Sequence, residues 1–204
     1  MTVKLYVEGG GDNKALQTEC RRGFSEFLRK AGLEGRMPRI VACGPRRRAY
    51  DSFRTSHQNW GGDVFPVLLV DSEGPVLGQD SWDHVRVRSG DGWSRPDGAS
   101  VDQLHVMVQA MEAWFHADKN ALLHYYGQCF KAGALGRRPD IENIPKADLF
   151  EGMRRATKDC ENGEYSKGRD SFKILSRIDP ALVEAASPCA KRFLESMSAI
   201  CKSE

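Results

Sequence analysis

One run of seven consecutive apolar residues, at positions 64–70, constrains the fold of this chain more than any other feature. A strand with one face in water alternates apolar and polar side chains, whereas a strand covered on both faces is apolar throughout. Strands of the second kind belong to parallel sheets that carry helices on both sides. The run is followed directly by two acids, Asp71 and Glu73, and then by Gly74 and Pro75, which end the strand.

Other strand patterns flank this run, and most are followed by a helical pattern. Residues 3–7 alternate as a strand does and lead into three consecutive glycines, after which apolar residues recur at three- and four-residue steps until Gly32. Further strands are predicted at residues 39–43, 84–87 and 104–108. Helices are predicted at residues 46–57, 109–117, 119–126, 146–160, 168–177, 180–186 and 189–202.

This order of elements predicts an α/β fold. Strands that alternate with helices in the first half of the chain indicate a mostly parallel sheet flanked by helices. The second half is almost entirely helical and reads as a C-terminal extension of the same domain. Since 204 residues suffice for one sizeable core and not for two ordinary domains, we expect a single domain. Its α/β core would occupy residues 1–118 and its helical extension residues 119–204.

The six cysteines form no metal-binding or redox motif, since no two are closer than twelve positions. We expect all of them to be reduced and most to be buried. The chain opens directly on a strand pattern interrupted by Glu8, without a charged-then-apolar leader, and its longest apolar run is far too short for a membrane span. These features predict a cytoplasmic protein without membrane contact.

Acidic residues stand where the predicted strands end. They are Glu8 after the first strand, Asp12 at the start of the first helix, Asp71 and Glu73 after the apolar run, and Glu112 after the strand at 104–108. The carboxyl ends of parallel strands share one edge of a sheet, so these side chains are expected to meet there. Carboxylates that lie so close stay ionised only if cations compensate them. Mg²⁺ and Mn²⁺ prefer carboxylate oxygens, and two such ions can promote phosphodiester cleavage.

The charge distribution is compatible with a site of this kind. The net charge of +2 hides a net charge of +6 over residues 1–48, −6 over residues 63–120 and +2 over residues 121–204. The acidic middle holds Asp71, Glu73 and Glu112 between more basic ends, and bound cations would offset much of its charge. The small total predicts modest intrinsic affinity for polyanions, so substrate capture would depend on metal or on a partner.

Several of these motifs resemble a known family. A strand ending on Glu8 and a later strand ending on Asp71-Ser72-Glu73 are similar to the Toprim signature, a strand-ending Glu and a later Asp-x-Asp. More closely, the chain resembles an uncharacterised bacterial Toprim-like family related to the overcoming-lysogenization-defect (OLD) nucleases. The matching segments are Val7-Glu8-Gly9, Leu69-Val70-Asp71-Ser72-Glu73, Met111-Glu112-Ala113-Trp114-Phe115 and Phe172-Lys173-Ile174-Leu175 followed by Ile178-Asp179-Pro180. The resemblance covers nearly the whole chain.

The resemblance implies roles for individual residues. Glu8 and Asp12 would bind one Mg²⁺ or Mn²⁺ ion, Asp71 and Glu73 would be shared across the site, and Glu112 would serve a second ion. Catalysis would also use a late lysine that contacts the scissile phosphate. This lysine is expected to be Lys173, with Lys167 as the alternative. Position 73 departs from the general Toprim pattern, which has Asp there.

Partners are implied in the same way. OLD nucleases combine a Toprim unit with an ATPase, and this chain has no Walker motif of its own. The resemblance therefore implies a separate ATPase subunit of the AAA or ABC type and a role in antiphage defence.

For many of these residues a purely structural interpretation stays open. Asp12 is equally suited to cap the first helix, Glu112 to pair with His116, and a lysine at 173 to lie on a helix surface. Arg46, Arg47 and Arg48, like Lys167, are candidate contacts for nucleic acid, yet an arginine run is commonly a solvated face. Loop tryptophans can stack on bases or anchor a loop in the core; the residues concerned are Trp60, Trp82 and Trp93.

The sequence thus favours a metal-dependent nuclease of the two-metal Toprim type. One alternative is a catalytically degenerate Toprim-like binding or regulatory subunit of an ATPase complex. Others are an endonuclease specific for RNA or tRNA and a small-molecule phosphohydrolase. The sequence does not choose between DNA and RNA as the substrate.

Overall fold

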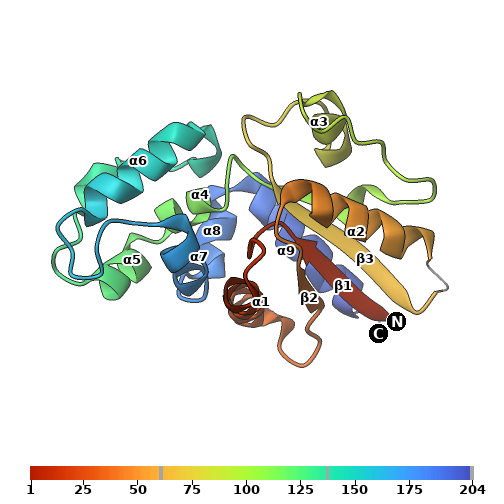
Figure 1. Cartoon of the computed structure of the whole chain (residues 1–204), viewed down its shortest axis with the longest axis horizontal. Coiled ribbons are helices and arrows are strands. Elements are labelled where there is room, and N and C mark those ends of the chain that lie inside the picture. Colours follow the sequence, from red (N-terminus) through yellow and green to blue (C-terminus); the bar gives the residue numbers. More distant parts are fainter. Residues whose placement is uncertain (60–61, 137, 203–204) are drawn as a thin grey trace.

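The computed structural model describes residues 1–59, 62–136 and 138–202, which build a parallel sheet with helices on both faces (Figure 1). The strands are β1 (Thr2–Val7), β2 (Arg39–Ala42), β3 (Val64–Asp71) and β4 (Leu104–Met107). Their order in the sheet is β2-β1-β3-β4, and every neighbouring pair is parallel. The predicted α/β fold with a parallel sheet and flanking helices is therefore confirmed.

Burial along β3 follows the prediction made from its apolar run. Val67 and Leu69 point into one core together with α1 (Lys14–Leu28) and α9 (Pro188–Lys202). Leu68 and Val70 point into a second core, which is covered by α2 (Arg46–Gln58) and α3 (Ser81–Val87). Burying both sides of the strand removes a large apolar area from water, which stabilises the sheet at its centre.

The second half of the chain forms a helical lobe at the carboxyl edge of the sheet. It begins with α4 (Glu112–Ala117) and continues with α5 (Lys119–Tyr126), α6 (Lys146–Thr157), α7 (Lys167–Leu175) and α8 (Pro180–Ala186), before α9 returns behind the sheet (Figure 1). Short helical turns join these elements at Arg29–Leu33, Val101–Gln103, Ala132–Leu135 and Ile141–Asn143.

Close packing of α7 on α1 fixes this lobe against the sheet. A Cβ atom at Gly23 of α1 would lie 2.7 Å from the carbonyl oxygen of Phe172 in α7, so only glycine allows this approach. The Phe172 ring lies 6.4 Å from that of Phe24. The amino end of α7 is thereby held next to the ends of β1 and β3.

One predicted strand is a helix instead. Residues 84–87 lie within α3, where the side chain of Asp80 caps the helix by accepting a hydrogen bond from the Asp83 backbone N–H. Trp82 and Val85, three residues apart, both turn into the core. The apolar spacing of three and the Asp cap are typical of a helix. The strand was predicted because the segment contains two β-branched valines, which are typical of strands.

Trp82 of α3 and Trp93 of the following loop are anchors rather than stacking platforms. The ring of Trp93 stacks on Tyr50 with 4.4 Å between centroids, and Trp82 donates its indole N–H to the Ser100 carbonyl. Both are almost fully buried, so neither ring is available to a base. Trp60 lies outside the described residues.

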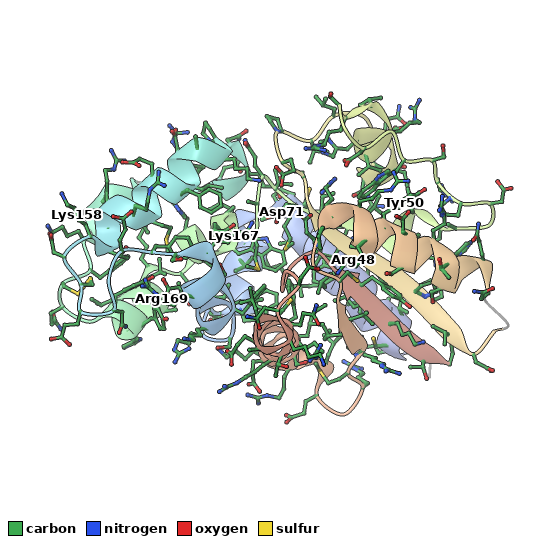
Figure 2. All side chains as sticks on the ribbon, in the orientation of Figure 1. Arg48, Tyr50, Asp71, Lys158, Lys167 and Arg169 are labelled. Carbon is green, nitrogen blue, oxygen red and sulfur yellow. A yellow bond between two sulfur atoms is a disulfide. The ribbon has the colours of Figure 1, made fainter. Side chains whose placement is uncertain are left out.

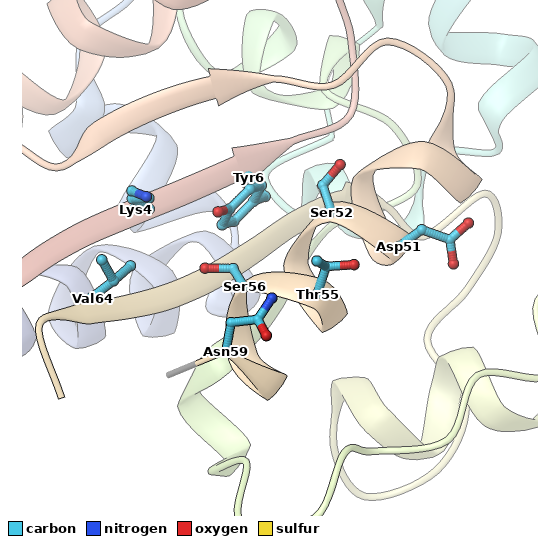
Figure 3. A pocket seen from close by; sticks show the side chains of 8 residues that line it. All are labelled: Lys4, Tyr6, Asp51, Ser52, Thr55, Ser56, Asn59 and Val64. Carbon is cyan, nitrogen blue, oxygen red and sulfur yellow. The ribbon is translucent and has the colours of Figure 1, made fainter. Parts of the chain in front are cut away.

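An open groove runs between α2 and β1, because α2 covers β3 better than it covers the β1–β2 side of the sheet (Figure 3). Its floor is formed by Lys4 and Tyr6, and its wall by hydroxyl and amide side chains of Ser52, Thr55, Ser56 and Asn59. The volume of this groove is about 560 Å³. Its polar lining marks a solvated face of the sheet that lies apart from the carboxyl edge, where the acidic residues gather.

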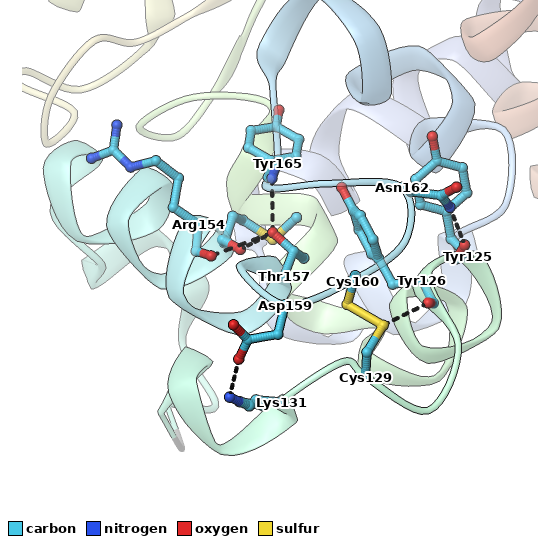
Figure 4. The surroundings of a disulfide bond; sticks show 11 residues. Tyr125, Tyr126, Cys129, Lys131, Arg154, Thr157, Asp159, Cys160, Asn162 and Tyr165 are labelled. Atoms are coloured by element: carbon cyan, nitrogen blue, oxygen red, sulfur yellow. Dashed lines mark hydrogen bonds and ion pairs between the residues drawn. A yellow bond between two sulfur atoms is a disulfide. The ribbon is translucent and has the colours of Figure 1, made fainter.

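Cys129 and Cys160 form a disulfide, so the expectation that all cysteines are reduced is wrong for this pair. Their Cα atoms are 5.1 Å apart although 31 positions separate them in the sequence, because the ends of α5 and α6 lie side by side (Figure 4). The same region is held by a hydrogen bond from the Lys131 backbone N–H to the Ala156 carbonyl. Cys20 and Cys43, by contrast, are buried thiols, as expected.

Among the described residues, no helix is both long enough and apolar enough to cross a bilayer.

We predict that Cys160→Ser lowers the free energy of unfolding by about 2–4 kcal/mol under non-reducing conditions, since the disulfide closes a loop of 31 residues. Urea titration with and without a thiol reductant measures this effect. Cys129→Ser should give the same loss, and both variants should match the wild type once reductant is present. A wild-type stability that does not respond to reductant would contradict the prediction.

Candidate metal centre

Three acidic side chains meet at the carboxyl edge of the sheet. Glu8 follows β1, Asp71 is the last residue of β3, and Glu73 lies two positions further on. Each offers one carboxylate oxygen, and these three atoms lie within 4.8 Å of one another. Parallel pairing of β1 with β3 brings them together, and the Asp71 backbone N–H donates to Glu8 Oε2 at 3.2 Å.

The glycine turn after β1 makes room for this arrangement. Gly9 has φ of +135°, and it exchanges backbone hydrogen bonds with Gly44 at 2.9 and 2.8 Å. A Cβ atom at Gly44 would lie 2.5 Å from the carbonyl oxygen of Gly11. Side chains at these positions would push the two loops apart, so the glycines let both loops close on Glu8.

Glu73 occupies a left-handed backbone conformation, with φ of +67°. This conformation costs a residue other than glycine roughly 1 kcal/mol or more, and it persists where surrounding contacts enforce it. Here the Glu73 backbone N–H donates to the Gln109 carbonyl at 2.8 Å, and the carboxylate meets Lys146 Nζ at 2.5 Å. The strained turn directs this side chain back toward Asp71.

Three cations surround the acidic cluster. Arg46 Nη1 lies 3.3 Å from Glu8 Oε2 and also donates to the Asp71 carbonyl, while its Nη2 pairs with Asp91 at 2.6 Å. Lys146 pairs with Glu73 as described, and Lys167 Nζ lies 3.3 Å from Asp71 Oδ2. Asp71 and Lys167 occupy the junction of the sheet and the helical lobe in Figure 2. Much of the mutual repulsion of the carboxylates is thus compensated by the protein itself.

Glu112 lies behind this cluster and is completely buried. Its Oε1 accepts a hydrogen bond from the Tyr165 hydroxyl at 2.7 Å. Its Oε2 has no hydrogen-bond partner among the described residues and lies 3.9 Å from Lys167 Nζ. A buried carboxylate oxygen without a partner costs free energy, so this atom is suited to receive a cation or a proton. His116 contacts the Leu149 carbonyl, so the alternative interpretation, in which Glu112 pairs with His116, does not apply.

The protonation of these groups follows from burial and from their neighbours. Burial, reinforced by the charge of Asp71, raises the pKa of Glu8 to about 7. Burial also raises the pKa of Glu112, against the opposing charge of Lys167. For Lys167, burial would lower the pKa, but the charges of Asp71 and Glu112 outweigh it, and the net shift is upward. Lys167 is therefore a permanent cation of the site.

Glu73 behaves differently from the other two glutamates. Burial would raise its pKa, but the hydrogen bond and charge of Lys146 dominate, and the pKa of Glu73 is lowered. Glu73 therefore stays ionised at neutral pH, which is the state a metal ligand needs.

Asp12 is not part of the cluster. Its side chain is 75% exposed and pairs with Arg48 at 2.7 Å. It is also not the cap of α1, because Asn13 accepts the backbone N–H groups of Ala15 and Leu16. The predicted ligand role of Asp12 thus lacks the required geometry, since the residue lies beyond the glycine turn and points into solvent.

The lysine at the site is Lys167 rather than Lys173. Both belong to α7, but six residues amount to about one and two-thirds helical turns, so the two side chains leave the helix in different directions. Both lysines are exposed, but Lys167 lines the cavity and its Nζ lies 3.3 Å from Asp71 Oδ2. Packing of Phe172 against Gly9 and Gly23 sets this rotation of α7.

The arginine run divides into one partly buried and two exposed residues. Arg46 belongs to the site and lies over the Trp93 ring at 4.8 Å, so its guanidinium is not a free phosphate contact. Arg47 and Arg48 are exposed and pair with Asp51 and Asp12. Lys146 and Tyr165 were not predicted from the sequence, since only tertiary packing brings them to Glu73 and Glu112.

The donor set at this edge fits a hard divalent cation. Glu8, Asp71 and Glu73 offer only oxygen atoms, as Mg²⁺ and Mn²⁺ prefer, and the unpartnered Oε2 of Glu112 lies behind them. Three carboxylate oxygens within 4.8 Å of one another can hold a metal ion.

The fold and the site together define a class, an α/β protein with a carboxylate-rich cluster at the carboxyl edge of its parallel sheet. The chain belongs to the family described as a domain of unknown function (DUF4276), whose model matches residues 7–198. No curated protein and no solved structure matches the chain. The matched range includes Glu8, Asp71, Glu73, Glu112 and Lys167, so the whole cluster lies within the family's domain.

We predict that Glu8→Gln removes a pH-dependent cost to stability in metal-free protein. Because the folded-state pKa of Glu8, about 7, exceeds the ordinary value of 4.5, ionising Glu8 destabilises the fold. This cost is absent below pH 4.5, grows as the pH rises toward 7 and is fully present above it. Relative to the wild type, the variant should gain up to about 3 kcal/mol in free energy of unfolding between pH 5 and pH 8.

Urea titrations in EDTA at the two pH values test this expectation. A Glu8→Gln variant whose stability changes with pH as the wild type does would show that Glu8 is already ionised at pH 5.

Proposed function

We propose that this protein is a metal-dependent nuclease that hydrolyses phosphodiester bonds of nucleic acid. The observation that carries the proposal is the convergence of Glu8, Asp71 and Glu73 within 4.8 Å, next to Lys167, whose Nζ lies 3.3 Å from Asp71 Oδ2. Carboxylates that hold Mg²⁺ or Mn²⁺ beside a lysine are suited to phosphoryl chemistry, in which anionic charge grows in the transition state. The similarity of the strand-end motifs to Toprim and OLD nucleases supports the same reaction.

In this proposal each residue has a defined task. Glu8, Asp71 and Glu73 would hold the cation, which supplies Lewis acidity toward a phosphate oxygen when bound. Glu112 would serve a second ion through its unpartnered Oε2. Lys167 would neutralise charge on the scissile phosphate, and Tyr165 keeps Glu112 in place through its hydroxyl. Because a carboxylate ligand must be ionised, and the pKa of Glu8 is about 7 in metal-free protein, cation binding near neutral pH would release a proton from Glu8.

The biological setting is proposed from kinship with OLD nucleases. A separate ATPase subunit would control the nuclease, and the pair would act in antiphage defence in the cytoplasm. In a reducing cytoplasm the Cys129–Cys160 pair would be a dithiol, with the hydrogen bonds around it holding the α5–α6 contact. DNA and RNA, including tRNA, are both candidate substrates.

A second candidate is a binding or regulatory subunit without catalysis, and one observation favours it. Arg46 and Lys146 already pair with Glu8 and Glu73, so the cluster is partly neutralised without any metal. A protein that had lost catalytic activity could keep such ion pairs as structural contacts, since removing one partner of a buried ion pair leaves the other charge uncompensated. Metal uptake separates this candidate from the nuclease.

We predict that the wild type binds Mn²⁺ and that Asp71→Ala weakens this binding at least about 100-fold, since losing even outer-shell partners of a metal costs roughly 10–100-fold. Calorimetric titration at pH 7.5 measures the affinity. Asp12→Ala is the matched control, because this carboxylate points into solvent and pairs with Arg48. Binding lost equally in both variants, or no binding by the wild type, would remove the proposed metal centre and leave the second candidate.

We predict that Lys167→Ala lowers the rate of cleavage about 10²–10³-fold, the usual effect of removing one group that stabilises charge in the transition state. Cleavage of labelled DNA, RNA and tRNA with Mg²⁺ or Mn²⁺, with and without the ATPase, provides the measurement. Lys173→Ala, on an exposed part of the same helix, should stay within about twofold of the wild type. The opposite order of effects would restore the role first predicted for Lys173.

A further inference from the structure

A cavity of about 310 Å³ opens directly beside the acidic cluster. On one side it is bordered by the charged groups of Glu8, Asp71 and Lys167. The rest of its wall is apolar and includes Leu16, Met107, Met111 and Phe172. The cavity therefore joins a site suited to a phosphate with a hydrophobic recess of defined size.

Binding a metal ion and a phosphate does not require the apolar wall of the cavity. A hydrated cation and a phosphodiester group need oxygen ligands and positive charge, which the charged side of the cavity supplies. Leu16 is partly buried, and Met107, Met111 and Phe172 are almost fully buried and border the cavity with small apolar surfaces. Such surfaces favour an apolar group attached to the phosphate, since they offer nothing to the phosphate itself.

The size of the cavity limits what that group can be. Its volume lies at the small end of the range for small-molecule sites, roughly 300–1,000 Å³. One base with its sugar fits this range, whereas a stacked and paired base in a duplex cannot enter a recess without being turned out of the helix.

We infer that this cavity receives the base and sugar of one unpaired nucleotide next to the phosphodiester bond that is cleaved. This inference rests on the proposed nuclease function and adds its substrate class, single-stranded or locally unpaired nucleic acid. Stacking on apolar side chains tolerates every base, because each base has a π-face. The recess therefore selects an unpaired nucleotide rather than a particular sequence.

Gly168 gives a direct way to fill the cavity. It lines the recess next to Lys167, and a Cβ atom built on it has no described atom within 4 Å. Its φ is not positive, so a larger residue is not strained there. Gly133 shares both properties and lies in the Ala132–Leu135 turn, away from the cavity. The pair Gly168→Leu and Gly133→Leu thus compares filling the recess with an equal change elsewhere.

The first experiment measures cleavage of one oligonucleotide sequence as a single strand and as a full duplex, with Mn²⁺ present. We expect the wild type and Gly133→Leu to prefer the single strand by about tenfold or more. Gly168→Leu should lose at least about tenfold on the single strand. Equal cleavage of both substrates by the wild type, or full activity of Gly168→Leu, would overturn the inference and leave the nuclease proposal standing.

The second experiment does not depend on activity. Calorimetry with Mn²⁺ compares adenosine 5′-monophosphate, uridine 5′-monophosphate and ribose 5-phosphate, which lacks a base. The two nucleotides should bind the wild type about tenfold or more tightly than ribose 5-phosphate, and Gly168→Leu should abolish this difference. Equal binding of all three by the wild type would show that the cavity does not hold a base.

The two experiments also show whether the nuclease proposal or the proposed role of the cavity is wrong. If no polymer is cleaved and no Mn²⁺ is taken up, the nuclease proposal fails, while nucleotide binding measured without metal still decides the role of the cavity. Thermal melting checks that both leucine variants are folded. If Gly168→Leu does not fold, the comparison of ribose 5-phosphate with the nucleotides on the wild type decides alone.

Discussion

Parallel pairing of β1 with β3 is the constraint on which the rest of the site depends. It places the residues that follow the two strands at one edge, so that Glu8 accepts a hydrogen bond from the Asp71 backbone. Several carboxylates then share a small, largely buried space, which is unfavourable unless cations are close. The ion pairs that Lys167 and Arg46 make with these carboxylates, and the raised pKa of Glu8, are consequences of that pairing.

The helical lobe supplies two of the cations that pair with the acidic residues at the edge of the sheet. Lys146 and Lys167 start α6 and α7, and their ammonium groups pair with Glu73 and Asp71 at the end of the sheet. Contact of α7 with Gly23 of α1 holds the two halves together at this point. Cluster and cavity thus lie at a junction between the two halves, where a substrate can touch both strand ends and helix starts.

Sequence patterns predicted the features that depend on local chemistry. The apolar run of β3 predicted a strand covered on both faces, and the acids after it predicted a cluster at the carboxyl edge. The patterns failed where proximity comes from packing of distant elements. The sequence pattern does not show which of Lys167 and Lys173 reaches the acidic cluster. The rotation of α7 against α1 decides this, because it places Lys167 next to Asp71. Cys129 and Cys160 meet because the ends of α5 and α6 are adjacent.

The sequence by itself therefore determined the parallel α/β class and the positions of Glu8, Asp71 and Glu73 after their strands. Both follow from hydrophobic periodicity and from the fixed direction of a parallel sheet. Only the tertiary structure decided that Asp12 points into solvent, that Arg46 and Lys146 neutralise the cluster, and that an apolar cavity opens beside it. These features depend on the angles at which helices pack, which side-chain periodicity does not encode.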